Sequence, residues 1–135
     1  MKKLLVSFSV LLLSIFTYSY AQTYKYMTTD YSYKYVNDYG RWTEWSKWEK
    51  TSMLVVLSLD RNVLSIYSEE MQEYDIYDWS REQTDADGGT TLEFKAVNRD
   101  GLRCNIRFRV QKDGQKQLYI DFNDVMWVYN IYLRN

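Results

Sequence analysis

The sequence has no histidine and no proline, and Cys104 is its one cysteine. Without histidine neither a Ser-His-Asp triad nor a Cys-His pair can form, and a zinc site built from the usual ligands is excluded. A single cysteine cannot form an internal disulfide. Because Cys104 alternates with polar neighbours, we interpret it as a small buried hydrophobe, and the sequence indicates no metal and no cofactor.

The chain also lacks a strong charge of either sign, with 17 basic and 18 acidic residues and a net charge of −1. This balance gives no reason to expect nucleic acid as a partner. Acidic residues prevail up to Gly89 and basic residues after it. Complementary strands of one fold would explain this asymmetry, and a dipolar surface for a charged partner is the alternative.

Only one apolar run stands out, over residues 4–16, and it is short for a membrane span. Two lysines precede it and small and polar residues follow it up to Ala21, which is the layout of a secretory signal peptide. We therefore expect residues 1–21 to be cleaved off between Ala21 and Gln22, which predicts a secreted or periplasmic protein without a membrane span. An uncleaved anchor is the alternative. The remaining residues 22–135 have the size of one domain.

The clearest pattern in the chain is the alternation over residues 102–111, where apolar residues take turns with arginines and amides. A period of two is typical of a strand with one buried and one exposed face. Similar patterns predict strands at residues 52–59, 63–68, 71–79, 90–96, 116–122 and 125–133. Asp-Gly, Asn-Asp and other short polar turns join them, which favours an antiparallel meander.

These patterns predict an all-β fold of about eight strands and no helix. We expect a small antiparallel barrel, a meander of the lipocalin or calycin kind, because closure removes exposed sheet edges. A two-sheet β-sandwich is the alternative. The polar stretch 80–89 predicts a loop. Its Asp85-Ala86-Asp87-Gly88 does not fit a calcium loop, because Phe94 stands where a bidentate glutamate would be needed.

Tyrosines dominate the stretch before the first turn. They stand at Tyr24, Tyr26, Tyr31, Tyr33 and Tyr35. The parity changes between the first two and the last three, so the sequence predicts a bulge near residues 28–30 or an irregular N-terminal arm over residues 22–40. The last three tyrosines are candidate ligand residues on an aromatic platform, and packing on a neighbouring sheet is the alternative.

Tryptophan recurs every three residues at Trp42, Trp45 and Trp48. The pattern resembles the W-x-x-W-S-x-W stripe of thrombospondin type 1 repeats, where tryptophans stack with arginines of neighbouring strands. That family needs disulfides, so only the stacking idea applies here. Gly40-Arg41-Trp42 resembles the G-x-W of lipocalins, which implies that Trp42 closes the barrel floor. The three tryptophans are candidate ligand residues, and a core-and-rim aromatic cluster is the alternative.

A longer set of motifs covers residues 42–132. It comprises Ile66-Tyr67-Ser68, Gln72-x-Tyr74-Asp75-Ile76, Asp100-Gly101-Leu102-Arg103-Cys104-x-Ile106, Gln117-Leu118-Tyr119-Ile120-x-Phe122 and Val128-Tyr129-Asn130. The set resembles small secreted β proteins of gut bacteria whose function is not known. This resemblance implies an exported bacterial β domain and no residue roles.

Two groups of charged residues are candidates for chemistry. A carboxylate pair of a hydrolase would have to come from Asp75, Asp78, Asp121 and Asp124. An anion or a partner could bind the stripe of Arg103, Arg107 and Arg109. However, Asp121 is expected on the same exposed face as these arginines, where a cross-strand ion pair is the simpler interpretation.

We therefore predict a non-enzymatic binding or protein-interaction module whose partner is an unknown protein or small ligand. The first alternative is a binder of a small apolar ligand or a glycan at an aromatic-lined barrel mouth. A hydrolase that uses two carboxylates is a more remote alternative. The sequence does not indicate an oligomeric state.

Overall fold

The computed structural model describes residues 23–80 and 82–134, so the expected signal peptide and its cleavage site lie outside the described residues. The described regular structure is all β. The strands are β1 (Thr23–Tyr35), β2 (Glu49–Lys50), β3 (Leu54–Ser58), β4 (Val63–Tyr67), β5 (Met71–Trp79), β6 (Gln83–Thr84), β7 (Thr90–Asn98), β8 (Arg103–Val110), β9 (Lys116–Asp121) and β10 (Val125–Leu133). Within residues 23–80 and 82–134, no helix is long and apolar enough to cross a membrane.

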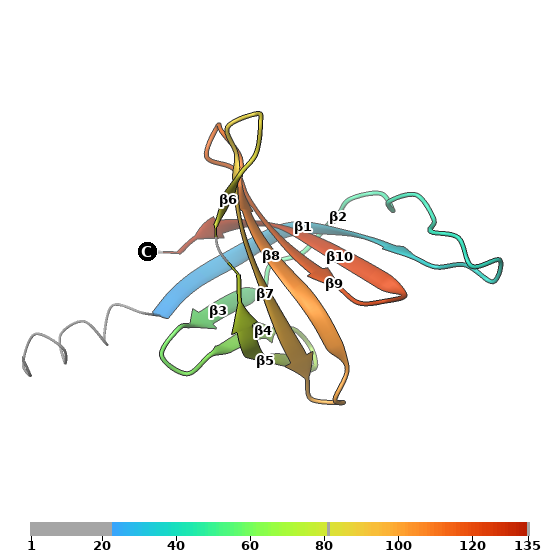
Figure 1. Cartoon of the computed structure of the whole chain (residues 1–135), viewed down its shortest axis with the longest axis horizontal. Helices are drawn as coiled ribbons and strands as arrows, with labels where there is room; N and C mark the ends of the chain where they lie inside the picture. Colours follow the sequence, from blue (N-terminus) through green and yellow to red (C-terminus); the bar gives the residue numbers. More distant parts are fainter. Residues whose placement is uncertain (1–22, 81, 135) are drawn as a thin grey trace, which may run out of the picture.

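Eight strands form a closed antiparallel ring (Figure 1). Their order around the ring is β1, β3, β4, β5, β7, β8, β9 and β10, and β10 pairs with β1 to close it. Two short strands lie outside the ring: β2 pairs with β1, and β6 pairs with the start of β7. The predicted barrel is confirmed, and the sandwich alternative is wrong.

Strand β1 closes the ring because it is long enough to serve two neighbours. Its first half, up to Met27, pairs with β3, and residues 26–35 pair with β10. The register with β10 shifts between Thr28 and Asp30, so Thr29 is the extra residue of a bulge. The predicted bulge is confirmed. It places Tyr24 and Tyr26 before it, and Tyr31 and Tyr33 after it, on the inward face of β1.

The middle of the barrel is filled by side chains from the inward faces of the strands. The most deeply buried large ones, each at most 1% exposed, are Val55, Leu64, Ile66, Phe94, Ile106, Leu118 and Ile120. In β8 the predicted alternation holds, since Cys104 and Ile106 are buried while Arg103 and Asn105 are exposed. Leu102 was expected on the buried face but is 57% exposed, because it belongs to the turn before β8 at the barrel end.

Four turns share one hydrogen-bond pattern over residues 37–41, 85–89, 98–102 and 111–115. In each, the N–H of the first residue donates to the carbonyl of the fifth, and the N–H of the fourth donates to the carbonyl of the first. The fourth residue is a glycine with φ between 73° and 91° in every case. A type I turn followed by a left-handed residue is a standard hairpin connection, and glycine adopts that conformation without strain. The turn at residues 85–89 and β6 replace most of the loop expected over residues 80–89.

Candidate functional site

The barrel interior is solid in its middle and hollow at both ends. The first cavity, of about 300 Å³, lies at the end where β1 begins. Its walls are mainly apolar and include Tyr26, Leu57, Leu59, Leu92, Phe108 and Val110. This volume is at the lower end of the range for small-ligand sites, which are concave and mostly apolar with a few polar groups.

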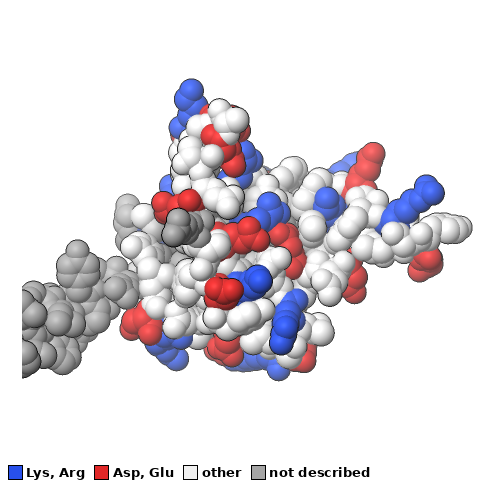
Figure 2. Space-filling model, viewed as in Figure 1, with Lys and Arg blue, Asp and Glu red and all other residues white. Residues whose placement is uncertain are grey.

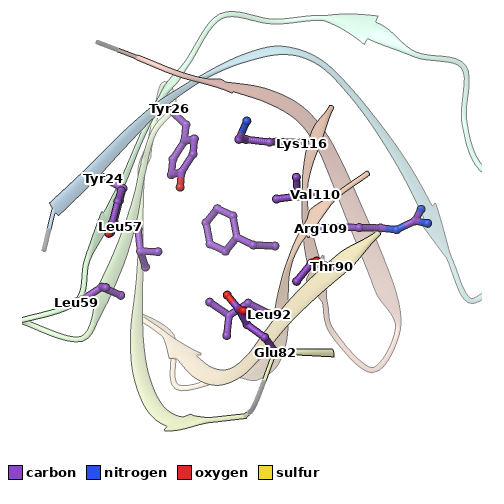
Figure 3. A pocket seen from close by; sticks show the side chains of 11 residues that line it. Tyr24, Tyr26, Leu57, Leu59, Glu82, Thr90, Leu92, Arg109, Val110 and Lys116 are labelled. Atoms are coloured by element: carbon purple, nitrogen blue, oxygen red, sulfur yellow. The ribbon is translucent and has the colours of Figure 1, made fainter. Parts of the chain in front are cut away.

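Two charged side chains face the first cavity. Lys116 and Glu82 lie on opposite sides of it (Figure 3), and the ammonium of Lys116 also donates a hydrogen bond to the carbonyl of Gly114 at 3.3 Å. Arg109 borders the cavity but points away from it (Figure 3). The cavity therefore combines an apolar body with one cation and one anion at its edge.

Aromatic side chains form one continuous wall beneath the first cavity. The ring centroid of Phe108 lies 5.5 Å from that of Tyr26 and 6.0 Å from that of Phe94, and Phe94 lies 4.8 Å from Trp79. Such tilted and offset contacts hold each ring in place. Burial, followed by the neighbouring Tyr24, raises the pKa of Tyr26, so its hydroxyl keeps its proton and can donate to a ligand.

The second cavity, of about 480 Å³, lies at the opposite end of the barrel and is wider open. The interior face of β7 shows that the ends are opposite, since Thr90 at its start borders the first cavity and Asn98 at its end borders the second. The second cavity differs in chemistry, because phenols, amides and a threonine hydroxyl line it together with apolar side chains.

The predicted ligand tyrosines do not form one platform. Tyr31 borders the second cavity, and its ring and that of Tyr33 pack on Trp127 with centroids 6.1 Å and 5.3 Å away. Tyr35, the last residue of β1, is 49% exposed. The structure thus brings Tyr31 to a cavity, uses Tyr33 in packing, and leaves Tyr35 at the surface.

The predicted ligand tryptophans lie outside the barrel, where Trp42, Trp45 and Trp48 are 40%, 41% and 48% exposed. They belong to the segment of residues 37–50, which follows β1 and packs along its outer side; for example, the N–H of Ser46 donates to the carbonyl of Tyr33 at 2.8 Å. The expectation that Trp42 closes the barrel floor is therefore wrong. A lipocalin-like G-x-W would have to lie on the first strand, whereas this one follows it.

A chain of cation–π and ring–ring contacts links this segment to the barrel. The ammonium of Lys34 lies 4.8 Å from the ring centre of Trp45, and the Trp45 and Tyr119 rings form a T-shaped pair with centroids 6.4 Å apart. The guanidinium of Arg107 in turn lies 4.1 Å from the Tyr119 ring centre. The resemblance implied tryptophans stacked with arginines, whereas here the cation beside Trp42 and Trp45 is Lys34 and Arg107 stacks on Tyr119. None of the named strands contains any of the three tryptophans.

The arginine stripe is mostly used within the fold. Arg107 forms a two-pronged ion pair with Asp121 at 2.7 Å and 3.2 Å, which confirms the expected cross-strand pair. Arg109 binds Asp85 and Asp87 at 3.4 Å and 3.2 Å, so the carboxylates that suggested calcium neutralise a guanidinium. Arg103 is exposed and forms no ion pair with the residues that the structure describes. In Figure 2 positive and negative side chains are interspersed over the visible face.

None of the candidate hydrolase carboxylates lines either cavity. Asp121 is held by Arg107, and Asp75, Asp78 and Asp124 are exposed and border neither cavity. In residues 23–80 and 82–134, no three His, Cys, Asp or Glu side chains are grouped in a way that could hold a metal ion. Burial raises the pKa of the Cys104 thiol to about 12, so this cysteine is a poor nucleophile.

The polar groups that sequence reasoning missed are inward-facing residues near the barrel ends. Lys116 shares the parity of buried Leu118, Gln72 that of Tyr74, and Asn98 that of Ala96; the three are partly exposed. The sequence did carry a signal for them: each is a polar residue at the end of a strand, at a position where the alternation would place an apolar, inward-facing residue. Such positions mark the mouths of a barrel whose middle is filled.

Comparisons of the chain with protein-family models, with curated proteins and with solved structures found no match.

Proposed function

We propose that this protein is a non-enzymatic binding module that holds a small apolar or amphiphilic ligand in the first cavity. The observation that carries the proposal is a hollow of about 300 Å³ with apolar walls inside one end of the barrel. When a ligand enters the cavity, its apolar surface is removed from water and packs against Leu57, Leu92 and Phe108. This burial stabilises the complex by roughly 25 cal/mol for each Å² of apolar surface. In an exported protein, as the N-terminal sequence predicts, such a site would bind molecules outside the cytoplasm.

The charged edge of the first cavity suits a ligand with one polar end. Lys116 could pair with a carboxylate, and Glu82 could accept from an amine or hydroxyl on the opposite side. The hydroxyl of Tyr26 adds a neutral donor. A ligand whose polar group stays at the opening and whose apolar part lies against Phe108 would use all of these groups.

Filling the cavity tests the proposal. The neutral fluorescent probe N-phenyl-1-naphthylamine should bind the full mature chain, and Leu59→Trp should weaken that binding by about tenfold or more, because the indole occupies the cavity. Leu102→Trp, at a leucine outside the cavity, is the matched control and should bind as the parent does. Equal binding by both variants, or no binding by the parent, would contradict the proposal.

A protein-interaction module is the second candidate, and the exposure of the three tryptophans favours it. Trp48 is 48% exposed, and Tyr39 at the tip of the same segment is 89% exposed. Large exposed aromatics are common in binding surfaces. The two functions separate experimentally: Trp48→Ser should leave binding of the naphthyl probe unchanged if the ligand site is in the barrel, and should weaken it if the ligand binds on the outer segment.

A further inference from the structure

The second cavity has a wall rich in neutral hydrogen-bonding groups. These come from Tyr31, Thr51, Gln72, Tyr74, Asn98 and Tyr129. Each hydroxyl can donate and accept, and each amide carries both a donor and an acceptor. This density of neutral groups contrasts with the first cavity, whose wall is mainly apolar with two charges facing in.

Two of the amides are held in fixed orientations. The Asn98 Oδ1 accepts the N–H groups of Asp100 and Leu102 at 3.0 Å and 2.9 Å, so its Nδ2 is the donor left for the cavity. The Gln72 Oε1 accepts the hydroxyl of Tyr74 at 2.6 Å, and its Nε2 donates to the Ser68 Oγ at 3.2 Å. A fixed amide pays little entropy when it binds a ligand, which favours recognition by these groups.

Apolar and aromatic surfaces complete the second cavity. Trp127, Phe122 and Met53 line it, and the Trp127 ring is braced by Tyr31 and Tyr33. A flat ring that faces a cavity offers an apolar surface beside polar groups at its edge. The C–H face of a sugar ring is apolar while its hydroxyls point outward, so this combination matches both parts of a sugar.

The described lining of the second cavity contains no charged side chain. Among the described residues no Lys, Arg, Asp or Glu lines the second cavity, and the Glu49 carboxylate, which is not part of the lining, accepts the hydroxyl of Tyr31. Burial raises the pKa of Tyr129 to about 12, partly offset by its hydrogen bond with Gln72, so the phenol stays neutral. A charged ligand would lose hydration here without gaining a partner of opposite charge, whereas a neutral polyol would exchange water for these groups.

We propose that the second cavity is a separate site for a neutral saccharide, bound by Thr51, Asn98 and Tyr129 and stacked beside Trp127. The site is distinct from the first cavity, since Phe94, Ile106 and Ile120 fill the barrel between them. The proposal extends the function: one barrel would carry an apolar ligand at one end and a sugar at the other. Each site can fail without the other, because their linings share no residue.

Ligand-observed saturation-transfer NMR on the full mature chain tests this site, with maltose, lactose and cellobiose as probes at millimolar concentration. At least one should receive saturation from the protein. Thr51→Val and Tyr129→Phe, which remove one hydroxyl each, should together weaken that binding by about tenfold, a usual loss when a polar partner is deleted. Tyr26→Phe makes the same chemical change in the first cavity and should leave sugar binding unaltered.

Thr51→Val alone guards against a folding artefact, because Thr51 is only partly buried and lies outside the regular strands. A melting temperature unchanged in this variant, with weaker sugar binding, supports the site. The proposal is overturned if none of the three disaccharides binds, if the double variant binds as the parent does, or if N-phenyl-1-naphthylamine displaces the sugar. The last result would place both ligands in one cavity.

Discussion

The ammonium of Lys34 lies 4.8 Å from the ring centre of Trp45 and 5.5 Å from that of Trp42. Lys34 points outward from β1, and both tryptophans come from the segment that follows it. Beneath this segment Ser32 and Val128, which also face outward, are only 1% and 3% exposed. The contact of Lys34 with the two tryptophans therefore holds the segment of residues 37–50 over the outer face where β1 meets β10. The residues beneath this segment form a second, smaller buried cluster.

Removal of the Lys34 charge should weaken the packing of the segment of residues 37–50 on the barrel. Lys34→Met keeps most of the apolar stem and should lower the free energy of unfolding in urea by about 1 kcal/mol, the usual size of a partly exposed cation–π contact. Lys47→Met is the control, an exposed lysine of the same segment. In a double-mutant cycle with Trp45→Ala, the coupling should recover most of that loss. A coupling of zero would mean that Lys34 is a bystander.

The three arginines of β8 should differ in their effect on stability. Arg107→Gln should cost about 1–2 kcal/mol, because it breaks a two-pronged pair with Asp121, whose side chain is only 12% exposed. Arg109→Gln should cost less, about 0.5 kcal/mol, since Asp87 is 66% exposed. Arg103→Gln should leave the free energy of unfolding unchanged. If urea unfolding gave the same small value for all three, the Arg107 pair would be no stronger than a solvent-screened one.

Deletion of Thr29 should damage the fold far more than its substitution. Without the extra residue the tyrosines before it, Tyr24 and Tyr26, would turn to the outside while those after it stay inside. We expect the deletion to cost several kcal/mol, because Tyr26 packs on Phe108 in the interior. Thr29→Ala keeps the bulge and should cost under about 1 kcal/mol. Thermal melting of both variants compares them, and similar melting temperatures would contradict a role for the bulge.

Local patterns were sufficient for much of the fold. Alternation in β8 identified Cys104 and Ile106 as interior residues, and the parity change among the tyrosines located the bulge within three residues. These signals are local because a strand shows two faces to two environments. Four of the turns were equally readable, since each has a glycine with positive φ at its fourth position.

The outer segment and the cavities could not be predicted in the same way. Closure of the ring depends on the pairing of Tyr31 with Tyr129, which are far apart in the chain, and no local pattern encodes that contact. The tryptophan segment has no periodicity of a strand, and its place is set by single contacts such as that of Lys34. Cavities are what remains after packing, so their position depends on every side chain around them.

Strongly alkaline solution should unfold the protein through its buried tyrosines. Burial raises the pKa of Tyr129 from 10.0 to about 12 and raises that of Tyr74 as well. Between these values the unfolded chain has lost the Tyr129 proton while the folded chain keeps it, so the free energy of unfolding falls as pH rises from about 10 to about 12 and is unaffected by this group below that window. Two pKa units correspond to roughly 3 kcal/mol.

Urea unfolding at a series of pH values tests this. The free energy of unfolding should fall less steeply with pH for Tyr129→Phe than for Tyr39→Phe, which changes an exposed tyrosine. Identical slopes for both variants would mean that Tyr129 does not drive the alkaline transition.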